Sequence, residues 1–280
     1  MREVAIIGAG DLGGALAHIL ARRSAARVVR LVDTAGRVAE GKALDIAQAA
    51  PVEGFATALA GGADWSSAAG ADVIVLADRF GAGEWTGDEA VQLLAQLSRS
   101  APRAILLCAG AAHREAVDRA VRDWKIPRAR LFGSAPEALA GGARALAALA
   151  VDASPRDVAI SVLGVPPDHT VIPWQDATLA GFALTRLLDE PSRRALAARA
   201  AALWPPGPYA LASAAAIAID AAAGRTRRIV SAFVAPDASS GVQTRTGALP
   251  VRLGASGIVE VVLPSLSVVE RIALENALSL

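Results

Sequence analysis

The sequence of 280 residues has one cysteine, few aromatic residues and no excess of charge of either sign. Because Cys108 has no partner in the chain, an internal disulfide is excluded, which is typical of proteins from a reducing compartment. The 28 basic residues are scattered among 27 acidic ones, so no basic field would attract nucleic acid, an anionic membrane or a polyanionic substrate. We therefore expect no nucleic-acid partner, and we interpret Cys108, within the apolar run AILLCAG, as a buried structural thiol.

Long hydrophobic runs are also absent. The longest apolar stretch, residues 210–223, is dominated by alanine, is interrupted by Asp220 and is shorter than the roughly 20 residues that span a bilayer. Residues 1–2 lead directly into a predicted strand, which leaves no room for the hydrophobic region of a signal peptide. We expect a soluble, cytoplasmic protein without a membrane segment, and we assign no metal site.

The first half of the chain alternates short apolar runs with longer Ala/Leu-rich helical patterns. The runs read VAIIG, RVVRLVD, ADVIVLA, RAILLCA and ARLFG. Strands that are apolar without interruption are buried on both faces, and helical crossovers between them produce a parallel sheet. The pattern predicts an α/β fold, with a Rossmann-type doubly wound parallel sheet over residues 1–134.

The pattern changes at about Pro136. A long Ala/Leu helix is followed by a predicted strand over 158–164, a proline-rich loop and two helices. Three further strands are predicted over 228–234, 249–253 and 257–263, and a last helix begins near Ser265. Residues 135–280 are therefore predicted to form a second, α+β domain with antiparallel strands.

Three glycines follow the first predicted strand with the spacing G-x-G-x-x-G. Gly8 allows a tight turn, Gly10 lets the backbone approach a pyrophosphate, and Gly13 lets helix and strand pack closely. Asp33 ends the second predicted strand about 20 residues further on, where a carboxylate accepts hydrogen bonds from a ribose diol and repels a 2′-phosphate. The set indicates NAD and not NADP. The alternative is that these glycines only shape the turn between a strand and a helix.

We assign the dinucleotide site to the glycine turn, the end of the second strand and the end of the third buried strand, that is, to Gly8, Gly10, Asp11, Leu12, Gly13, Asp33 and Ala77. His18 lies inside the first predicted helix, and we interpret it as a packing residue.

Several longer segments carry a family resemblance. The segment GKALDIAQAAPVEGF at 41–55, and later DVAISVLG, TLAGFALTRLL, ALASAAAIAIDAAAG and GALPVRLGASGIVEVVLPSL, resemble the NAD-dependent malate and lactate dehydrogenase family in the same order. The resemblance implies a Rossmann domain followed by a substrate domain, NAD as cofactor and a small 2-oxo or 2-hydroxy acid as substrate. It also implies a homodimer or tetramer, with the helix GKALDIAQAA and the helix near Ser213 as candidate contact surfaces.

The residues that the family uses for chemistry do not match. The family's His-Gly-Asp motif falls on Pro166-Pro167-Asp168, and a proline has no side chain that can carry a proton. The family's Asp-x-x-Arg falls on Leu139 and Gly142, which leaves Arg144 to match a further arginine seen in many members.

The loop that follows the third buried strand also departs from the family. Its Thr-Ala-Gly becomes Ala77-Asp78-Arg79, and FGAGEWTGDE replaces the arginine-bearing mobile loop. The Asn-Pro after the next strand becomes Ala111-Ala112. A shortened lid cannot deliver its arginine or exclude water in the usual way.

These departures leave three hypotheses. The first is a divergent, NAD-binding family member without the usual catalytic residues, acting as a sensor, a scaffold or a partner subunit of an active homologue. The second is an oxidoreductase with relocated groups, drawn from His169, Asp168, Arg144 and Arg79, with Glu84 and His113 lining the same cleft. His169 is otherwise an exposed loop residue, and His113 otherwise hydrogen-bonds the backbone at a helix start. The third is a structural protein without a ligand.

Overall fold

A computed structural model describes residues 1–237 and 245–279. Six parallel strands form the first half of the sheet, in the order β3-β2-β1-β4-β7-β8. Their bounds are β1 Glu3–Ile7, β2 Val28–Val32, β3 Ala58–Gly62, β4 Val73–Leu76, β7 Ile105–Cys108 and β8 Leu131–Gly133. The strand order reverses between β1 and β4, and ligands of doubly wound sheets bind at such a point. The predicted α/β Rossmann-type fold is confirmed.

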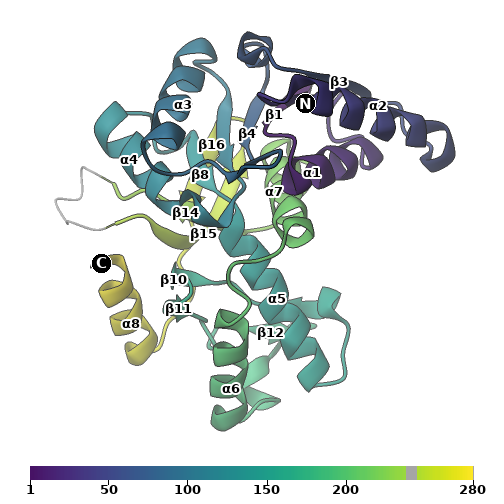
Figure 1. The fold of residues 1–280 in the computed structure, drawn as a ribbon. Coiled ribbons are helices and arrows are strands. Elements are labelled where there is room, and N and C mark those ends of the chain that lie inside the picture. The colour runs from purple at the N-terminus through teal and green to yellow at the C-terminus, as the bar shows by residue number, and fades with distance from the viewer. Residues whose placement is uncertain (238–244, 280) are drawn as a thin grey trace.

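Helices cover both faces of this sheet, which explains the continuously apolar strands. Val4 and Ile6 of β1 face the core beneath α1 (Asp11–Arg22), whereas Ala5 and Ile7 face the core beneath α3 (Gly87–Ser100) and α4 (Arg114–Trp124). Successive strand residues point to opposite faces, so both sets need a hydrophobic partner. α2 (Gly36–Glu53) crosses from β2 to β3 (Figure 1).

The second half extends the same sheet with antiparallel strands. β14 (Val230–Val234) pairs with β8, and the order continues through β15, β10 and β11, while β16 pairs with β15. The bounds of these strands are β10 Leu163–Val165, β11 His169–Val171, β15 Gly247–Gly254 and β16 Gly257–Val261. The sheet therefore crosses the predicted boundary at residues 134/135, and that division into two domains stays a prediction.

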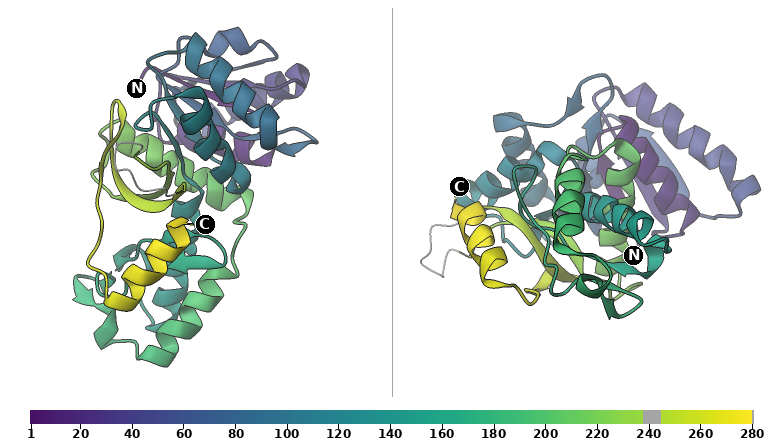
Figure 2. Two further views of the ribbon diagram at one scale, coloured as in Figure 1. Left: turned by 90° about the vertical axis from the view of Figure 1, so that its left-hand side faces the viewer. Right: turned by 90° about the horizontal axis from the view of Figure 1, so that it is seen from below.

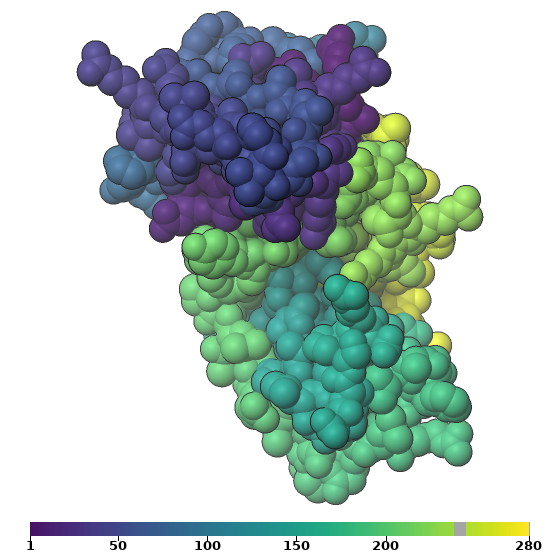
Figure 3. Space-filling view, turned by 90° about the vertical axis from the view of Figure 1, so that its right-hand side faces the viewer, coloured from purple at the N-terminus to yellow at the C-terminus, as the bar shows by residue number. Residues whose placement is uncertain are grey.

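The lower lobe in Figure 1 carries most of the remaining helical segments and a small sheet. α5 (Ala135–Ala150) leads into it from β8, next to α6 (Glu190–Ala201), and α7 (Pro208–Ala222) returns to pack beside α1 in the hydrophobic core. The small sheet has the order β13-β12-β9, and α8 (Val268–Ser279) ends the described chain. Its strands are β9 Val158–Ala159, β12 Thr178–Leu179 and β13 Phe182–Ala183. The left view of Figure 2 and Figure 3 show this teal and green lobe below the N-terminal half.

Two details differ from the expectations. The single strand predicted over 158–164 is two short strands in different sheets, β9 and β10, because their partner strands come from different parts of the chain. His18, interpreted as a packing residue, is partly exposed, and its Nε2 lies 3.1 Å from Glu53 Oε1. Cys108 is fully buried and free, as predicted, and burial raises the pKa of its thiol.

Candidate functional site

The glycine turn between β1 and α1 has the geometry that its spacing predicts. Gly8 has φ +118°, and a Cβ there would overlap the backbone of Asp78. A Cβ on Gly13 would overlap the carbonyl oxygen of Gly8. The first and third glycines are therefore required by the turn itself, since L side chains rarely adopt this φ and the backbone cannot easily yield.

Asp33 ends β2 and is completely buried beneath the turn. Its carboxylate accepts hydrogen bonds from the backbone N–H groups of Ala9 at 2.7 Å, Ala35 at 2.9 Å and Phe80 at 3.0 Å. Burial acts to raise the pKa of Asp33, but these hydrogen bonds outweigh it and hold the pKa below its usual value. The carboxylate predicted to bind the ribose is therefore negatively charged. In this conformation it is bound by backbone N–H groups of the chain itself.

Asp78 lies in the mouth of the glycine turn, at the N-terminus of α1. Its carboxylate accepts hydrogen bonds from Gly13 N at 2.9 Å and Leu12 N at 3.3 Å, and its carbonyl oxygen accepts one from Gly10 N at 2.9 Å. A Cβ on Gly10 would overlap this carboxylate. Sequence reasoning assigned the neighbouring Ala77, which is buried, and missed Asp78. The signal was the acidic residue in place of the family's Thr-Ala-Gly.

A second carboxylate binds backbone N–H groups in the segment that follows β7, the strand next to β4. Glu84 accepts hydrogen bonds from Ala111 N at 3.0 Å and Ala112 N at 2.7 Å, where the family carries its Asn-Pro. The buried His113 follows at the end of the 3₁₀ helix Ala111–His113, and its Nδ1 accepts a hydrogen bond from Gly110 N at 3.0 Å. The backbone role foreseen for His113 is therefore the one the structure shows.

The stability of the protein should depend on pH through His113. Burial lowers its pKa from 6.5 to about 4, so the unfolded chain binds the extra proton before the folded chain does. The stabilisation is complete above pH 6.5 and is lost as the pH falls from 6.5 to about 4, by about 3 kcal/mol at most. We expect urea titrations between pH 7 and pH 4.5 to show a steeper loss for the wild type than for His113→Gln. Equal slopes would contradict the buried, neutral imidazole.

Arg79, one of the candidate catalytic residues, follows Asp78 directly and already has binding partners. Its Nη1 donates to both carboxylate oxygens of Glu89 at 2.9 Å, and its guanidinium carbon lies 4.4 Å from the centre of the Trp85 ring. Trp85 is buried and packs edge-to-face on Trp65. In this conformation Glu89 neutralises the guanidinium charge and Trp85 stacks on it, so Arg79 is not a free cation.

Arg144, the second candidate arginine, is buried on α5. Its Nη1 donates to Glu137 Oε1 at 2.6 Å and its Nε donates to the carbonyl oxygen of Ile160 at 3.0 Å. The other oxygen of Glu137 accepts a hydrogen bond from Ser231 N at 2.9 Å. This closed network joins α5 to β14 and to the segment before β10, which is the pattern of a structural ion pair.

His169 and Asp168 are exposed beside the turn between β10 and β11, where His169 pairs with Val165 across the ladder. Within the described residues, no hydrogen bond or ion pair joins either of them to Arg79 or Arg144. The structure therefore brings the dinucleotide candidates together around the glycine turn, but it does not assemble the four catalytic candidates through any direct polar contact.

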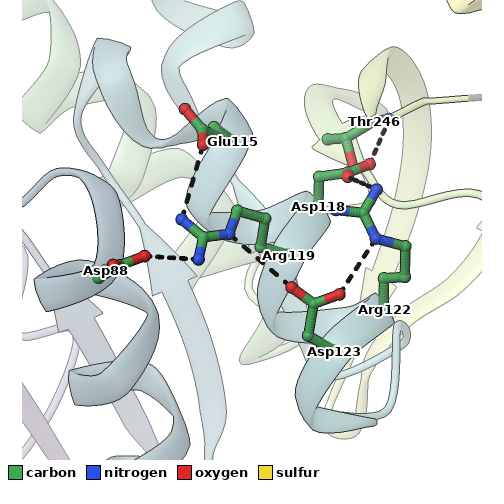
Figure 4. A network of polar contacts seen from close by, with 7 residues as sticks. All are labelled: Asp88, Glu115, Asp118, Arg119, Arg122, Asp123 and Thr246. Carbon is green, nitrogen blue, oxygen red and sulfur yellow. Dashed lines mark hydrogen bonds and ion pairs between the residues drawn. The ribbon is translucent and has the colours of Figure 1, made fainter.

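A separate cavity of about 260 Å³ lies against α4, and Figure 4 shows the ionic network beside it. Arg119 pairs with Asp88 of α3 and with Glu115 and Asp123, and Arg122 pairs with Asp118 and Asp123. Asp118 also accepts both the N–H and the hydroxyl of Thr246. Arg114 and Arg245 also line this cavity, and the network beside it joins α3, α4 and the start of β15.

Within residues 1–237 and 245–279, no group of three or more His, Cys, Asp or Glu side chains is placed to hold a metal ion. No helix in this part of the chain has the length and apolar character needed to cross a membrane.

Known proteins match both the sequence and the fold. Residues 2–96 match the model of the lactate/malate dehydrogenase NAD-binding domain, which confirms NAD as the predicted cofactor. Malate dehydrogenase of Thermomicrobium roseum is 30% identical over 295 residues, covering 99% of this chain and 94% of the relative.

The solved structures agree. Malate dehydrogenase of Salinibacter ruber superposes with a TM-score of 0.87 at 25% identity, over 99% of this chain and 94% of that chain. Lactate dehydrogenase of Cryptosporidium parvum, complexed with lactic acid and NAD, shares the fold with a TM-score of 0.85 at 21% identity, over 99% and 94% of the two chains. The glycine turn, the doubly wound sheet and these full-length matches together place this chain in the lactate/malate dehydrogenase family.

Proposed function

We propose that this chain is an NAD-binding family member that does not catalyse the ordinary 2-hydroxy-acid dehydrogenase reaction. It would act in the cytoplasm as a sensor, a scaffold or a partner subunit of an active homologue. Residues 1–134 would form its NAD-binding domain and residues 135–280 its substrate-type domain. The glycine turn and the family match of residues 2–96 support the binding half of this proposal.

The proposed loss of the ordinary reaction is supported by the state of the candidate catalytic residues. Pro166 stands where the family has its acid/base histidine, and it offers no titratable group. Glu89 and Glu137 bind the guanidinium groups of Arg79 and Arg144, so neither arginine is free to grip a substrate carboxylate. His169 is exposed on a strand edge, and among residues 1–237 and 245–279 no carboxylate is hydrogen-bonded to it. This supports retained binding without the original chemistry.

Thermal unfolding with and without NAD tests the binding half. A ligand that binds only the native state raises the melting temperature, so we expect a concentration-dependent rise at millimolar NAD. Gly10→Ala should abolish this rise, because a Cβ there fills the place where the backbone approaches the pyrophosphate. Gly141→Ala, at an open helical position in α5, is the matched control and should retain the rise. Absence of any rise in the wild type would contradict the proposal.

Oxidation of NADH with a panel of small 2-oxo acids tests the second half. We expect no turnover above the uncatalysed rate with any of them. Turnover that His169→Ala abolishes would contradict the proposal and support relocated catalytic groups instead. Co-purification with an active malate or lactate dehydrogenase subunit would support the partner-subunit role.

We further propose a homodimer or tetramer in which α2 is a contact surface. Only Ala39 and Ala43 of this helix are buried in the chain, while Leu44 and Val52 are exposed. The helix near Ser213, by contrast, is α7, which is mostly buried against the rest of the same chain. Light scattering should give a mass above that of one chain, and Leu44→Glu should reduce it to the monomer mass. A monomeric wild type would contradict this proposal.

A further inference from the structure

A short hairpin, residues 78–84, lies over the proposed NAD site. Its strands are β5 (Asp78–Arg79) and β6 (Gly83–Glu84), which pair antiparallel between Asp78 and Glu84. The sequence FGAGEWTGDE, which stands in place of the family's mobile loop, begins within this hairpin at Phe80. Asp78 and Glu84, one at each end of the hairpin, place two carboxylates near the point where the strand order reverses.

The first carboxylate occupies the anion-binding end of the glycine turn. A dinucleotide pyrophosphate binds at such a helix N-terminus through backbone N–H groups. In this chain the N–H groups of Leu12 and Gly13 already donate to Asp78. The carboxylate also overlaps the position of a Cβ on Gly10, which is where the backbone should be open to the phosphates. In this conformation the turn does not fit NAD, on grounds of both space and charge.

The rest of the hairpin closes neighbouring parts of the site in the same way. The N–H of Phe80 donates to Asp33, so the hairpin also engages the carboxylate proposed for the ribose. Glu84 accepts from Ala111 and Ala112, and a Cβ on Gly110 would overlap its carboxylate. Three residues of one segment, Asp78, Phe80 and Glu84, therefore satisfy polar groups around the proposed dinucleotide site.

The base of the hairpin is held in place by its side chains. Arg79 makes its two-oxygen contact with Glu89 on α3 and stacks on Trp85 directly after β6. These contacts leave the carboxylates at high local concentration next to their N–H partners, so they compete effectively with a dissolved anion.

We propose that residues 78–84 are an internal competitor for NAD, with Asp78 as the group that stands in for the pyrophosphate. This inference rests on the proposed NAD-binding function and adds its regulation. NAD binds only when Asp78 leaves the turn, so the apparent Kd is the Kd of the open site divided by the open fraction. If about one molecule in ten is open, the affinity is about tenfold weaker than that of the bare turn.

Titration calorimetry with NAD on the full chain tests this inference. Asp78→Ala removes the competing carboxylate, and we expect its Kd for NAD to fall at least tenfold below that of the wild type. Asp78→Asn keeps the shape and removes the charge, and should fall between the two. Asp88→Ala makes the same change of net charge at an exposed carboxylate on α3 and should leave the Kd unchanged. A wild type that binds NAD as tightly as Asp78→Ala would overturn the inference.

Amide hydrogen exchange without NAD gives a readout independent of binding. The amides of Leu12 and Gly13 should be protected in the wild type and exchange at least tenfold faster in Asp78→Ala. Equal exchange rates would overturn the inference even if NAD binds. If both amides are protected as expected but neither protein binds NAD, the internal carboxylate stands and the proposed NAD-binding function fails.

Discussion

Replacing Gly8 by alanine is expected to lower the free energy of unfolding by about 4 kcal/mol. Gly8 has φ +118°, a region that costs an L residue about 1–3 kcal/mol. A Cβ there would also overlap the carbonyl oxygen of Asp78, which is backbone next to a buried strand and cannot rotate away. Relieving such an overlap by shifting the backbone adds about 1–3 kcal/mol.

Urea denaturation of Gly8→Ala measures this loss, and Gly141→Ala is its control. Gly141 is an exposed position inside α5 with open space around its Cα, so alanine there should stabilise the protein by about 0.5–1 kcal/mol. The two substitutions are chemically identical and should have opposite signs. A Gly8→Ala protein within about 1 kcal/mol of the wild type would contradict the turn geometry.

Replacing Arg144 by methionine is expected to cost about 3–5 kcal/mol of stability. The guanidinium and the Glu137 carboxylate are both buried, and removal of one leaves the other as an uncompensated charge. Glu137→Gln should also be costly, because its amide oxygen can still accept the N–H of Ser231 but its NH2 group then faces the donor Arg144 Nη1. The double variant Glu137→Gln/Arg144→Met should be more stable than Arg144→Met alone.

A double-mutant cycle by urea denaturation measures this coupling. Arg252→Met provides the control, because Arg252 forms an exposed ion pair with Glu260 and such pairs contribute about 0–1 kcal/mol. A cycle without coupling between Glu137 and Arg144 would contradict the structural ion pair. Unchanged stability of Arg144→Met would reopen a substrate role for this arginine.

The NAD-binding half of the molecule could be predicted from local sequence patterns. Unbroken apolar runs indicate strands that are buried on both faces. The short-range sterics of the turn determine the spacing of Gly8, Gly10 and Gly13, and the acid at Asp33 belongs to the same pattern. These constraints act within one strand-turn-helix unit, so a single sequence contains them. The family resemblance extended the prediction to the second half, where the strand predicted over 158–164 was nevertheless two strands.

The pairing of charged side chains was decided by the tertiary structure. Asp78 and Gly13 are 65 residues apart in the chain, and Glu137 reaches Ser231 across 94 residues. The acidic residue in place of the family's Thr-Ala-Gly marks Asp78 as unusual, but the local sequence does not distinguish an exposed loop carboxylate from one that fills a helix N-terminus. Buried polar groups take whichever partner the packed elements bring within hydrogen-bond distance. The sequence by itself therefore determined the fold and the glycine turn, whereas only the packing of the hairpin against α1 decided that Asp78 lies in that turn.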